Sequence, residues 1–201
     1  MTELITMHTH STFCNHAKDP LHDMVQAAVD AGVAHMAATE HYPIPDELDP
    51  SKRSTMPIER LGAYIEAVRD QQKRDDIDVL LGCELDWLGE DETRSLHASD
   101  FDQFDIVLGS VHFVDRWLMV SHKHVSRWKS IDLEAFWNRY VELWCQAVKS
   151  DMPFTVMSHA DVVKKFSPKP EFDLEPLYER MAKAAREGGR MIEVNTSGAY
   201  A

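Results

Sequence analysis

Leu4-Ile5-Thr6-Met7-His8-Thr9-His10 opens the chain with a short apolar run that ends in two histidines, and Ser11-Thr12-Phe13-Cys14-Asn15-His16 continues it. The apolar run predicts a short buried strand over residues 4–8. Side chains two residues apart on a strand point to the same side, so His8 and His10 can present their imidazoles to one point. His16 follows in the predicted turn. Because imidazole is the commonest metal ligand among side chains, this stretch suggests the first half of a metal site.

Further along, strand-like apolar runs alternate with stretches that have helical spacing. The helical stretches begin at Asp19, Pro57, Asp132 and Phe172 and end at Gly32, Lys73, Lys149 and Glu187. The predicted strands cover residues 4–8, 33–39, 77–83, 105–111, 154–157 and 190–194. Regular alternation of strand and helix predicts an α/β fold with a parallel sheet. In such folds the functional groups gather at the carboxyl ends of the strands.

Metal-competent side chains stand at the ends of five successive predicted strands. They are His8 and His10, then His41, Glu84, His112 and His159. Neutral imidazoles with a carboxylate suit Zn, Mn or Fe, and six or more ligands exceed what one four-coordinate ion needs. We therefore expect a multinuclear site with Glu84 as the bridging carboxylate. Such a site can clamp a phosphoryl group and supply a metal-bound hydroxide as the nucleophile.

The composition is that of an ordinary soluble globular protein. Its formal charge of −13 argues against a nucleic-acid or anionic-membrane surface, and no apolar run reaches the ~18 residues of a membrane span. Cys14, Cys83 and Cys145 form no C-x-x-C pair, and the first residues lack the basic start of a signal peptide, so we expect a cytoplasmic protein. A small phosphorylated substrate is compatible with the charge, because bound cations reverse the local sign.

Taken in order, the motifs resemble those of the PHP (polymerase and histidinol phosphatase) family, over residues 5 to about 198. They are His8-Thr9-His10, His16, Thr39-Glu40-His41, Gly82-Cys83-Glu84, Gly109-Ser110-Val111-His112 and Ser158-His159. Residues 13–17, 109–113 and 159–166 are similar to the histidinol-phosphatase branch of the family. The resemblance implies a distorted TIM-like (β/α)7 barrel that holds two to three divalent ions.

The resemblance also implies roles for individual residues. It places His8, His10 and Glu84 on a first ion, Glu84, His112 and His159 on a second, and His16 and His41 on a third. The implied reaction is hydrolysis of L-histidinol phosphate to L-histidinol and phosphate, in histidine biosynthesis. Glu84 and His112 are the residues whose loss we expect to abolish turnover. Asp161 is a candidate general acid, or a support for His159.

The end of the sequence departs from the family pattern. The family closes with Asp-x-His after a further strand, and residues 194–201 contain no such motif. We therefore expect a single domain over residues 1–201 that is C-terminally incomplete and lacks the last strand and helix of the barrel. The edges of the first and last strands would then be exposed, and they could pair with another copy in a homo-oligomer.

Two other functions stay open at this point. A PHP phosphoesterase could act on another small phosphate ester, and a noncatalytic metal-binding protein could result from the missing Asp-x-His. Lys164, Lys165, Arg116 and Arg190 are candidates for holding phosphate, and the sequence does not rank them. Cys14 lies between predicted ligands, and we expect it to be a packed residue rather than a metal contact.

Overall fold

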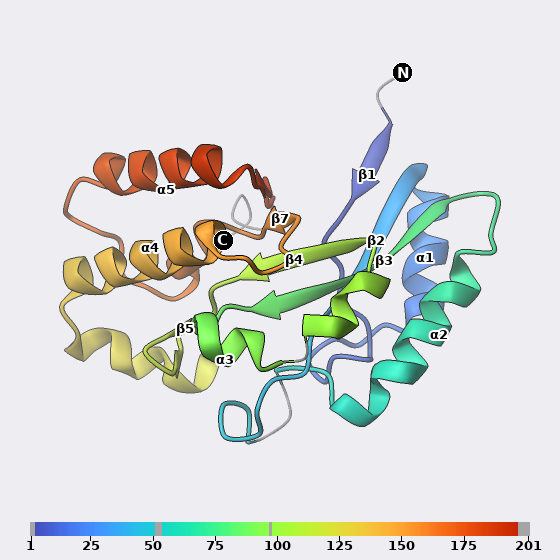
Figure 1. Ribbon diagram of the computed structural model, residues 1–201, viewed down its shortest axis with the longest axis horizontal. Coiled ribbons are helices and arrows are strands. Elements are labelled where there is room, and N and C mark those ends of the chain that lie inside the picture. The colour runs from blue at the N-terminus through green and yellow to red at the C-terminus, as the bar shows by residue number, and fades with distance from the viewer. Residues whose placement is uncertain (1–2, 51–53, 97, 197–201) are drawn as a thin grey trace. The chain divides into compact units, whose positions relative to one another are not determined.

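The computed structural model describes residues 3–50, 54–96 and 98–196 (Figure 1). Its strands are β1 (Leu4–Thr6), β2 (Val33–His41), β3 (Asp78–Asp86), β4 (Ile106–Ser110), β5 (Phe113–Val114), β6 (Trp117–Leu118), β7 (Val156–Met157) and β8 (Met191–Ile192). Its α-helices are α1 (Leu21–Asp30), α2 (Leu61–Gln71), α3 (Glu90–Arg94), α4 (Leu133–Lys149) and α5 (Glu175–Gly188). Short 3₁₀ helices cover Ile58–Arg60, Ala98–Gln103, His122–Ser130 and Val162–Lys165.

The larger sheet follows the order expected of strand–helix repeats. Its strands are hydrogen-bonded in the order β1-β2-β3-β4-β7-β8, and β1, β2 and β3 pair in parallel, as do β7 and β8. β5 and β6 form a separate antiparallel hairpin. In the register of β2 and β3, His41 lies opposite Glu84. This alternation and parallel pairing confirm the predicted α/β fold.

The chain folds into two compact units. Unit 1 contains the residues up to Leu85 together with Leu96–Leu108. Unit 2 contains Asp86–Ser95 and the residues from Gly109 onward. The chain therefore passes between the units within β3, after α3 and within β4.

In unit 1, helix α2 is tied to the sheet by a buried tyrosine. The Tyr64 hydroxyl lies 2.6 Å from the carbonyl oxygen of Ala38 on β2 and 2.7 Å from that of Gly82 on β3. Its single proton can serve one of the two carbonyls at a time. Burial raises the pKa of Tyr64 well above its usual range, so the hydroxyl stays protonated and remains a donor. This contact fixes α2 against the two strands that carry His41 and Glu84.

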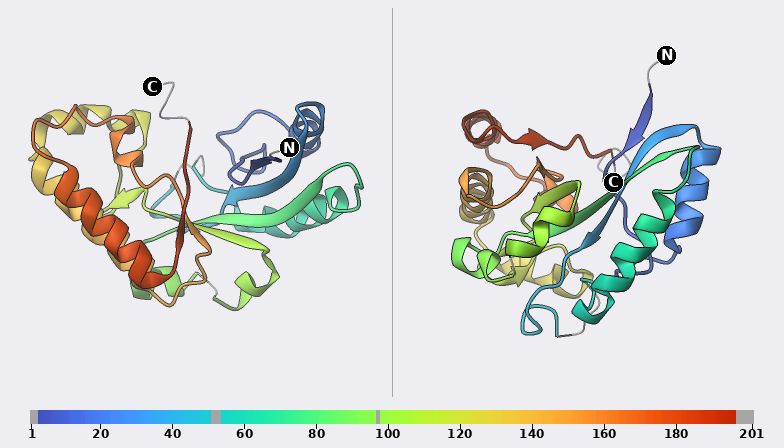
Figure 2. Two further views of the ribbon diagram at one scale, coloured as in Figure 1. Left: turned by 90° about the horizontal axis from the view of Figure 1, so that it is seen from above. Right: turned by 45° about the vertical axis from the view of Figure 1, so that its right-hand side comes forward.

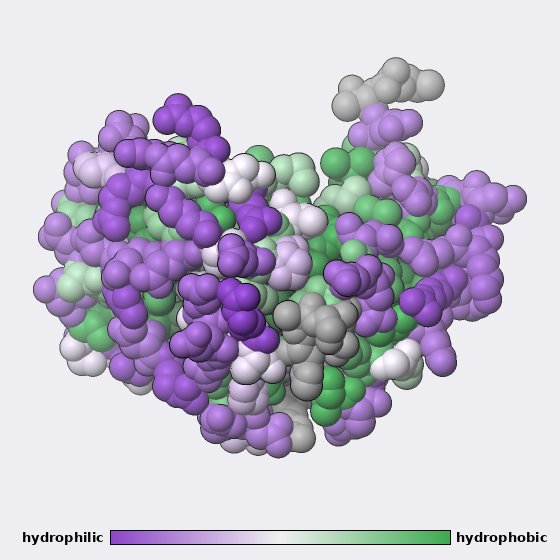
Figure 3. Space-filling view, in the orientation of Figure 1, coloured by the Kyte–Doolittle hydropathy of each residue, from purple (hydrophilic) through white to green (hydrophobic). Residues whose placement is uncertain are grey.

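In unit 2, helices α4 and α5 pack along each other (Figure 2). As predicted, Asp132 caps α4, because its carboxylate accepts a hydrogen bond from the Ala135 N–H at 3.0 Å. Trp137, Tyr140 and Trp144 form part of its buried stripe. The outward side of α5 is hydrophilic (Figure 3). Among the helices of the described residues, none has the length and apolar character needed to cross a membrane.

Arg190 stabilises the segment between α4 and β7 in unit 2 through hydrogen bonds to its backbone. Its guanidinium donates to carbonyl oxygens of Val148, Ser150, Met152 and Phe154, at 3.4, 3.0, 2.9 and 2.5 Å. These bonds use the fork of donors that a phosphate would otherwise engage. Arg190 is therefore a structural residue, and it leaves the set of candidate phosphate-binding cations.

The strands predicted over residues 154–157 and 190–194 are shorter, at Val156–Met157 and Met191–Ile192, and three further segments differ from the prediction in other ways. The first strand covers Leu4–Thr6 and is not buried, since Leu4 and Ile5 are 57% and 61% exposed. Within the part of the chain that the structure describes, its one strand neighbour is β2. β3 extends to Asp86, so Glu84 lies within the strand and not after it. Glu84 and Asp86 are both buried in the strand, whereas the prediction took Glu84 as its end. The last predicted helix begins at Glu175 instead of Phe172, because Asp173 accepts from the Glu175 N–H and Pro176 occupies the first turn.

Candidate metal centre

His8 and His10 lie in the segment that follows β1, beyond the observed end of the strand, and their imidazoles still meet. Between them, the Thr9 N–H donates to Thr39 Oγ1 at 2.9 Å, and the Thr9 hydroxyl donates to the Ala37 carbonyl oxygen at 2.8 Å. Thr9 therefore faces β2. The two imidazoles point away from that contact, and their Nε2 atoms lie 3.0 Å apart.

Glu84 lies at the centre of the imidazoles of unit 1. Its Oε2 is 3.3 Å from His8 Nε2, 3.2 Å from His10 Nε2 and 2.9 Å from His41 Nδ1. The carboxylate is 1% exposed. One carboxylate oxygen that faces three ring nitrogens brings four potential metal ligands to one point.

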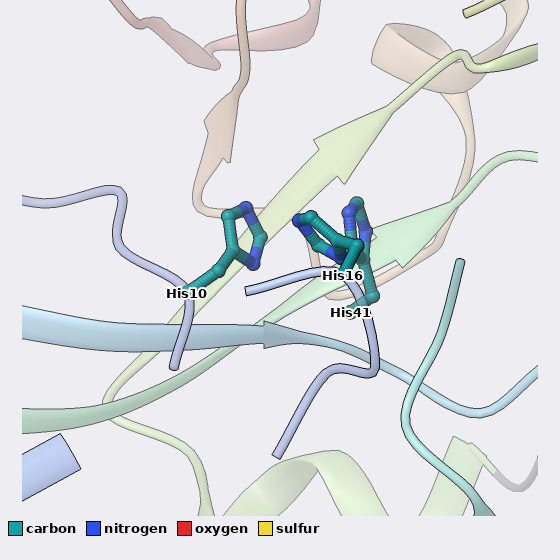
Figure 4. A group of neighbouring side chains, drawn as sticks. All are labelled: His10, His16 and His41. Atoms are coloured by element: carbon teal, nitrogen blue, oxygen red, sulfur yellow. The ribbon is translucent and has the colours of Figure 1, made fainter. Parts of the chain in front are cut away.

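His16 adds a further imidazole to this group. Ligand atoms of His10, His16 and His41 lie within 4.8 Å of one another (Figure 4). The rings of His10 and His41 stack with their centroids 4.4 Å apart, and the His16 ring is 5.2 and 5.1 Å from these two. Unit 1 thus brings together every ligand that the sequence predicts in it: His8, His10, His16, His41 and Glu84.

This donor set fits a divalent cation. Burial, followed by the nearby His41, lowers the pKa of His10, while Glu84 acts in the opposite direction. His10 is therefore a neutral imidazole with a free lone pair near neutral pH, which is the form that binds metal. Nitrogen and carboxylate ligands of this kind suit Zn, Mn or Fe.

A buried carboxylate, Glu40, organises the turn that joins His10 to His16. Its Oε1 accepts from the Ser11 N–H at 2.6 Å and from the Ser11 hydroxyl, and its Oε2 accepts from the Cys14 N–H at 3.1 Å. Glu40 is 0% exposed. On the other side of the same turn, the Arg60 guanidinium donates to the carbonyl oxygens of Thr12 and Phe13 at 3.0 and 3.2 Å.

Cys14 packs between these groups as a thiol. Its Sγ accepts from the His41 N–H at 3.0 Å. Burial and then the charge of Glu40 raise the pKa of the Cys14 thiol far above its usual range. A metal ligand must be the thiolate, so these surroundings favour the packing role over metal contact.

Unit 2 holds a second, smaller group of imidazoles. His112 Nε2 lies 3.2 Å from His159 Nε2, and His112 is 5% exposed. The Nδ1 atom of His112 lies 2.8 Å from Oδ1 of the buried Asp86, to which it donates as Nδ1–H. This contact leaves Nε2 of His112 as the lone-pair nitrogen that faces His159. The backbone of His159 is held in turn, since its N–H donates to Glu193 Oε2 at 2.6 Å.

Glu40, Asp86 and Glu193 are the site residues that the sequence reasoning missed. Asp86 stands two residues after Glu84 on the same strand, and Glu193 directly follows β8. The expectation of chemistry at strand ends covers both positions, and it would have found them had every acid there been considered. Glu40 lies inside the quoted Thr39-Glu40-His41 motif, where only the histidine was assigned a role.

The remaining candidates lie on the surface of unit 2. Asp161 is exposed, and its Oδ2 is 3.0 Å from Lys164 Nζ; its role as general acid stays a prediction. Arg116 pairs with Glu92 at 3.0 Å. Lys165 Nζ lies 5.5 Å from the centroid of the Phe166 ring.

Comparison with known proteins supplies the family context. The model of the PHP domain matches residues 6–197. A protein of Deinococcus radiodurans named probable histidinol-phosphatase is 31% identical over 201 residues, which cover 98% of this chain and 75% of the relative. A Schizosaccharomyces pombe protein of the same name is 26% identical over 218 residues, covering 96% of this chain and 69% of the relative.

Solved structures show the same fold at lower identity. A Listeria monocytogenes protein, assigned provisionally as a histidinol phosphatase, superposes with a TM-score of 0.83 at 21% identity, covering 98% of this chain and 84% of that one. Histidinol phosphate phosphatase of Lactococcus lactis, in complex with zinc, L-histidinol and phosphate, superposes with a TM-score of 0.75 at 17% identity, covering 96% and 73%.

Proposed function

Because the chain belongs to the PHP domain family, we propose that it is a metal-dependent phosphomonoesterase that hydrolyses L-histidinol phosphate to L-histidinol and phosphate. The names of two relatives and the L-histidinol and phosphate bound to one structural neighbour support this substrate. The proposal includes a place in histidine biosynthesis, a cytoplasmic location and a possible homo-oligomer.

The observation that carries the proposal is the convergence of imidazoles on Glu84. Three ring nitrogens lie within 3.3 Å of one carboxylate oxygen, and His16 joins the same group. Four histidines and a buried glutamate at one point offer five potential ligands of the kind that divalent ions bind. In unit 2, the ordered pair of His112 and His159 offers two further ligands.

Divalent Zn, Mn or Fe ions, two to three in number, would supply a bound water of lowered pKa and neutralise charge on the phosphate ester. The chain's own residues prepare for this. His10 is neutral because it is buried. Asp86 holds the proton of His112 on Nδ1, so that Nε2 is free to bind. Asp161 stays the candidate donor of a proton to the leaving alkoxide.

The first test is phosphate release from L-histidinol phosphate by the chain reconstituted with Mn, Fe or Zn. His112→Ala should lower kcat/KM at least about 100-fold, because it removes a ligand along with the contact that orients it. His22→Ala is the matched control, since His22 is exposed and lies outside the ligand groups. We expect this control to keep wild-type activity.

A substrate panel separates the proposal from its rivals. Faster release from p-nitrophenyl phosphate or a nucleoside monophosphate than from L-histidinol phosphate would indicate a PHP phosphoesterase of another specificity. A folded, metal-loaded chain that hydrolyses none of them would indicate metal binding without catalysis. Full activity of the His112→Ala variant would show that the site assignment is wrong.

A further inference from the structure

We propose that Glu40 is a positioning residue, whose carboxylate holds the turn of residues 11–17 so that His10 and His16 face His41. The inference rests on the proposed metal centre and goes beyond it, because it assigns the geometry of that centre to a side chain that need not touch the metal. Glu40 is on β2, directly before His41, and consecutive side chains of a strand point to opposite sides.

Within the described residues, the side-chain hydrogen bonds of Glu40 go to the turn that carries the ligands. Both carboxylate oxygens are used, one by the N–H and hydroxyl of Ser11 and the other by the N–H of Cys14. Ser11 directly follows His10, and Cys14 lies two residues before His16. The carboxylate therefore fixes the backbone at two positions between the histidines, one next to His10 and one near His16.

His16 depends on this backbone more than the other ligands do. His16 is exposed, whereas Glu84 is buried and His10 and His41 are half-buried. Packing can orient the last three, but the position of an exposed side chain follows mainly from its turn. Glu40 accepts hydrogen bonds from N–H groups of the turn, and Arg60 donates hydrogen bonds to two of its carbonyl oxygens. A carboxylate that accepts from backbone N–H groups and a guanidinium that donates to backbone carbonyls restrain the same backbone segment in complementary ways.

Glu40→Gln tests the proposal while it preserves volume. The amide can accept at one end only, and its NH2 group then faces either the donors of Ser11 or the N–H of Cys14. We expect the affinity for the weakest-bound Co(II) ion to fall at least about 10-fold in competition with a chelator. The ligand-field spectrum of that ion should change, whereas the far-UV circular dichroism should stay that of the wild type.

Asp49→Asn is the matched control. Asp49 is also buried, and its carboxylate also accepts from two backbone N–H groups and a hydroxyl, those of Ser54 and Thr55. That loop carries none of the predicted ligands. If loss of any such buried carboxylate loosened the metals, both variants would lose affinity equally, and the proposal would be overturned.

Ser11→Ala keeps the proposal testable if Glu40→Gln does not fold. It removes one of the three donors and leaves Glu40 in place, so the affinity for the weakest-bound ion should fall about 3-fold. In the double variant the effect should equal that of Glu40→Gln alone, because both changes act through the same contact. Wild-type affinity in Glu40→Gln, or additive effects in the double variant, would overturn the proposal.

The two proposals fail in different ways. A wild-type chain that binds metal and hydrolyses no phosphate ester would overturn the proposed function, while the effect of Glu40 on metal affinity would still be measured. A wild-type chain that binds no Co(II), Zn or Mn would overturn both.

Discussion

Three of the segments that carry predicted ligands are held by a buried or half-buried carboxylate. Glu40 takes N–H groups of the turn between His10 and His16, Asp86 takes the Nδ1–H of His112, and Glu193 takes the backbone N–H of His159. An imidazole has two nitrogens, and a metal uses only one. A carboxylate that fixes either the other nitrogen or the nearby backbone therefore decides where the lone pair points.

Asp86→Asn should weaken metal binding about 10-fold. The amide oxygen can still accept from His112 Nδ1–H, but without the negative charge that makes the ring a stronger ligand. The measurement is metal affinity by chelator competition, together with kcat/KM for L-histidinol phosphate. Asp78→Asn is the control, because it removes the charge from a His–Asp contact of nearly equal length, 2.9 Å, at the exposed His35. Equal losses in the two variants would contradict the role of Asp86.

For single residues, the sequence predicted the role of the histidines as ligands and not the role of the acidic residues that position them. Histidines are few and recur at strand ends, so their positions carry a signal. The chain has 34 acidic residues, most of which are solvated in any protein, so an acid is not marked by its type alone. Burial distinguishes Glu40 and Asp86, and burial depends on the packed structure.

Among the elements, the hairpin that follows His112 contains a strained turn. β5 and β6 are joined by Asp115 and Arg116, with φ of 48° and 63°. Two consecutive positive φ values in a two-residue loop define a type I′ turn, in which Asn and Gly are preferred. Both side chains are tied down instead, Asp115 to Arg139 and Arg116 to Glu92.

Arg116→Gly should therefore be more stable than Arg116→Ala. Both variants lose the exposed ion pair with Glu92, which contributes between ~0 and 1 kcal/mol. Only glycine relieves the positive φ, which costs an ordinary residue roughly 1–2 kcal/mol, and the greater freedom of glycine in the unfolded chain offsets part of this. We expect the free energy of unfolding to differ by about 1 kcal/mol in a urea titration. An Ala variant as stable as the Gly variant would show that the turn is not strained.

Asp78→Asn should destabilise the chain more at pH 5.5 than at pH 8. His35 of β2 lies opposite Asp78 of β3, and this hydrogen-bonded carboxylate, with Glu3, raises the pKa of His35 above its ordinary 6.5. A raised pKa in the folded state means that the stabilisation is fully present below pH 6.5 and is lost as the pH rises through the folded value. The measurement is the difference in Tm between wild type and variant at the two pH values. A difference that grows with pH would contradict the assignment.

The elements also show where sequence patterns stop being informative. The long helix α4 was predicted with its cap, because Asp132 and the apolar stripe are local signals. The end of β3 was not predicted correctly, because Glu84 and Asp86 are buried in the strand, and polar residues in a sequence usually indicate that a strand has ended. The exposure of Leu4 and Ile5 depends on which strands neighbour β1, which is not a local property.

For the whole molecule, the sequence predicted the fold class and not the division into units. The strand–helix alternation, the match to the PHP domain and the superposition at a TM-score of 0.83 agree with the predicted TIM-like α/β fold of the PHP type. Two of the three points where the chain passes between the units lie inside β3 and β4, and the third follows α3. Composition shifts identify linkers between domains, so they carry no signal for a boundary within a strand.

Metal should stabilise the whole chain, because ligands are drawn from segments far apart in sequence. In unit 1 alone they come from residues 8 to 84, and the unfolded chain cannot hold them together. A metal at 100 times its Kd stabilises the folded state by about 2.7 kcal/mol, which corresponds to a rise in Tm of roughly 5–10 °C for a chain of this size. The shift should shrink at pH 5.5, where protons compete with metal for the imidazoles.

Glu84→Gln assigns that stabilisation to the predicted centre. The variant lacks the charge that faces His8, His10 and His41, so its Tm should rise by less than half of the wild-type shift on addition of Zn or Mn. Glu142→Gln on the exposed side of α4 is the control, and it should keep the full shift. Calorimetry with and without metal makes the comparison. If Glu84→Gln kept the full shift, the metals would bind elsewhere, and the convergence of imidazoles on Glu84 would need another explanation.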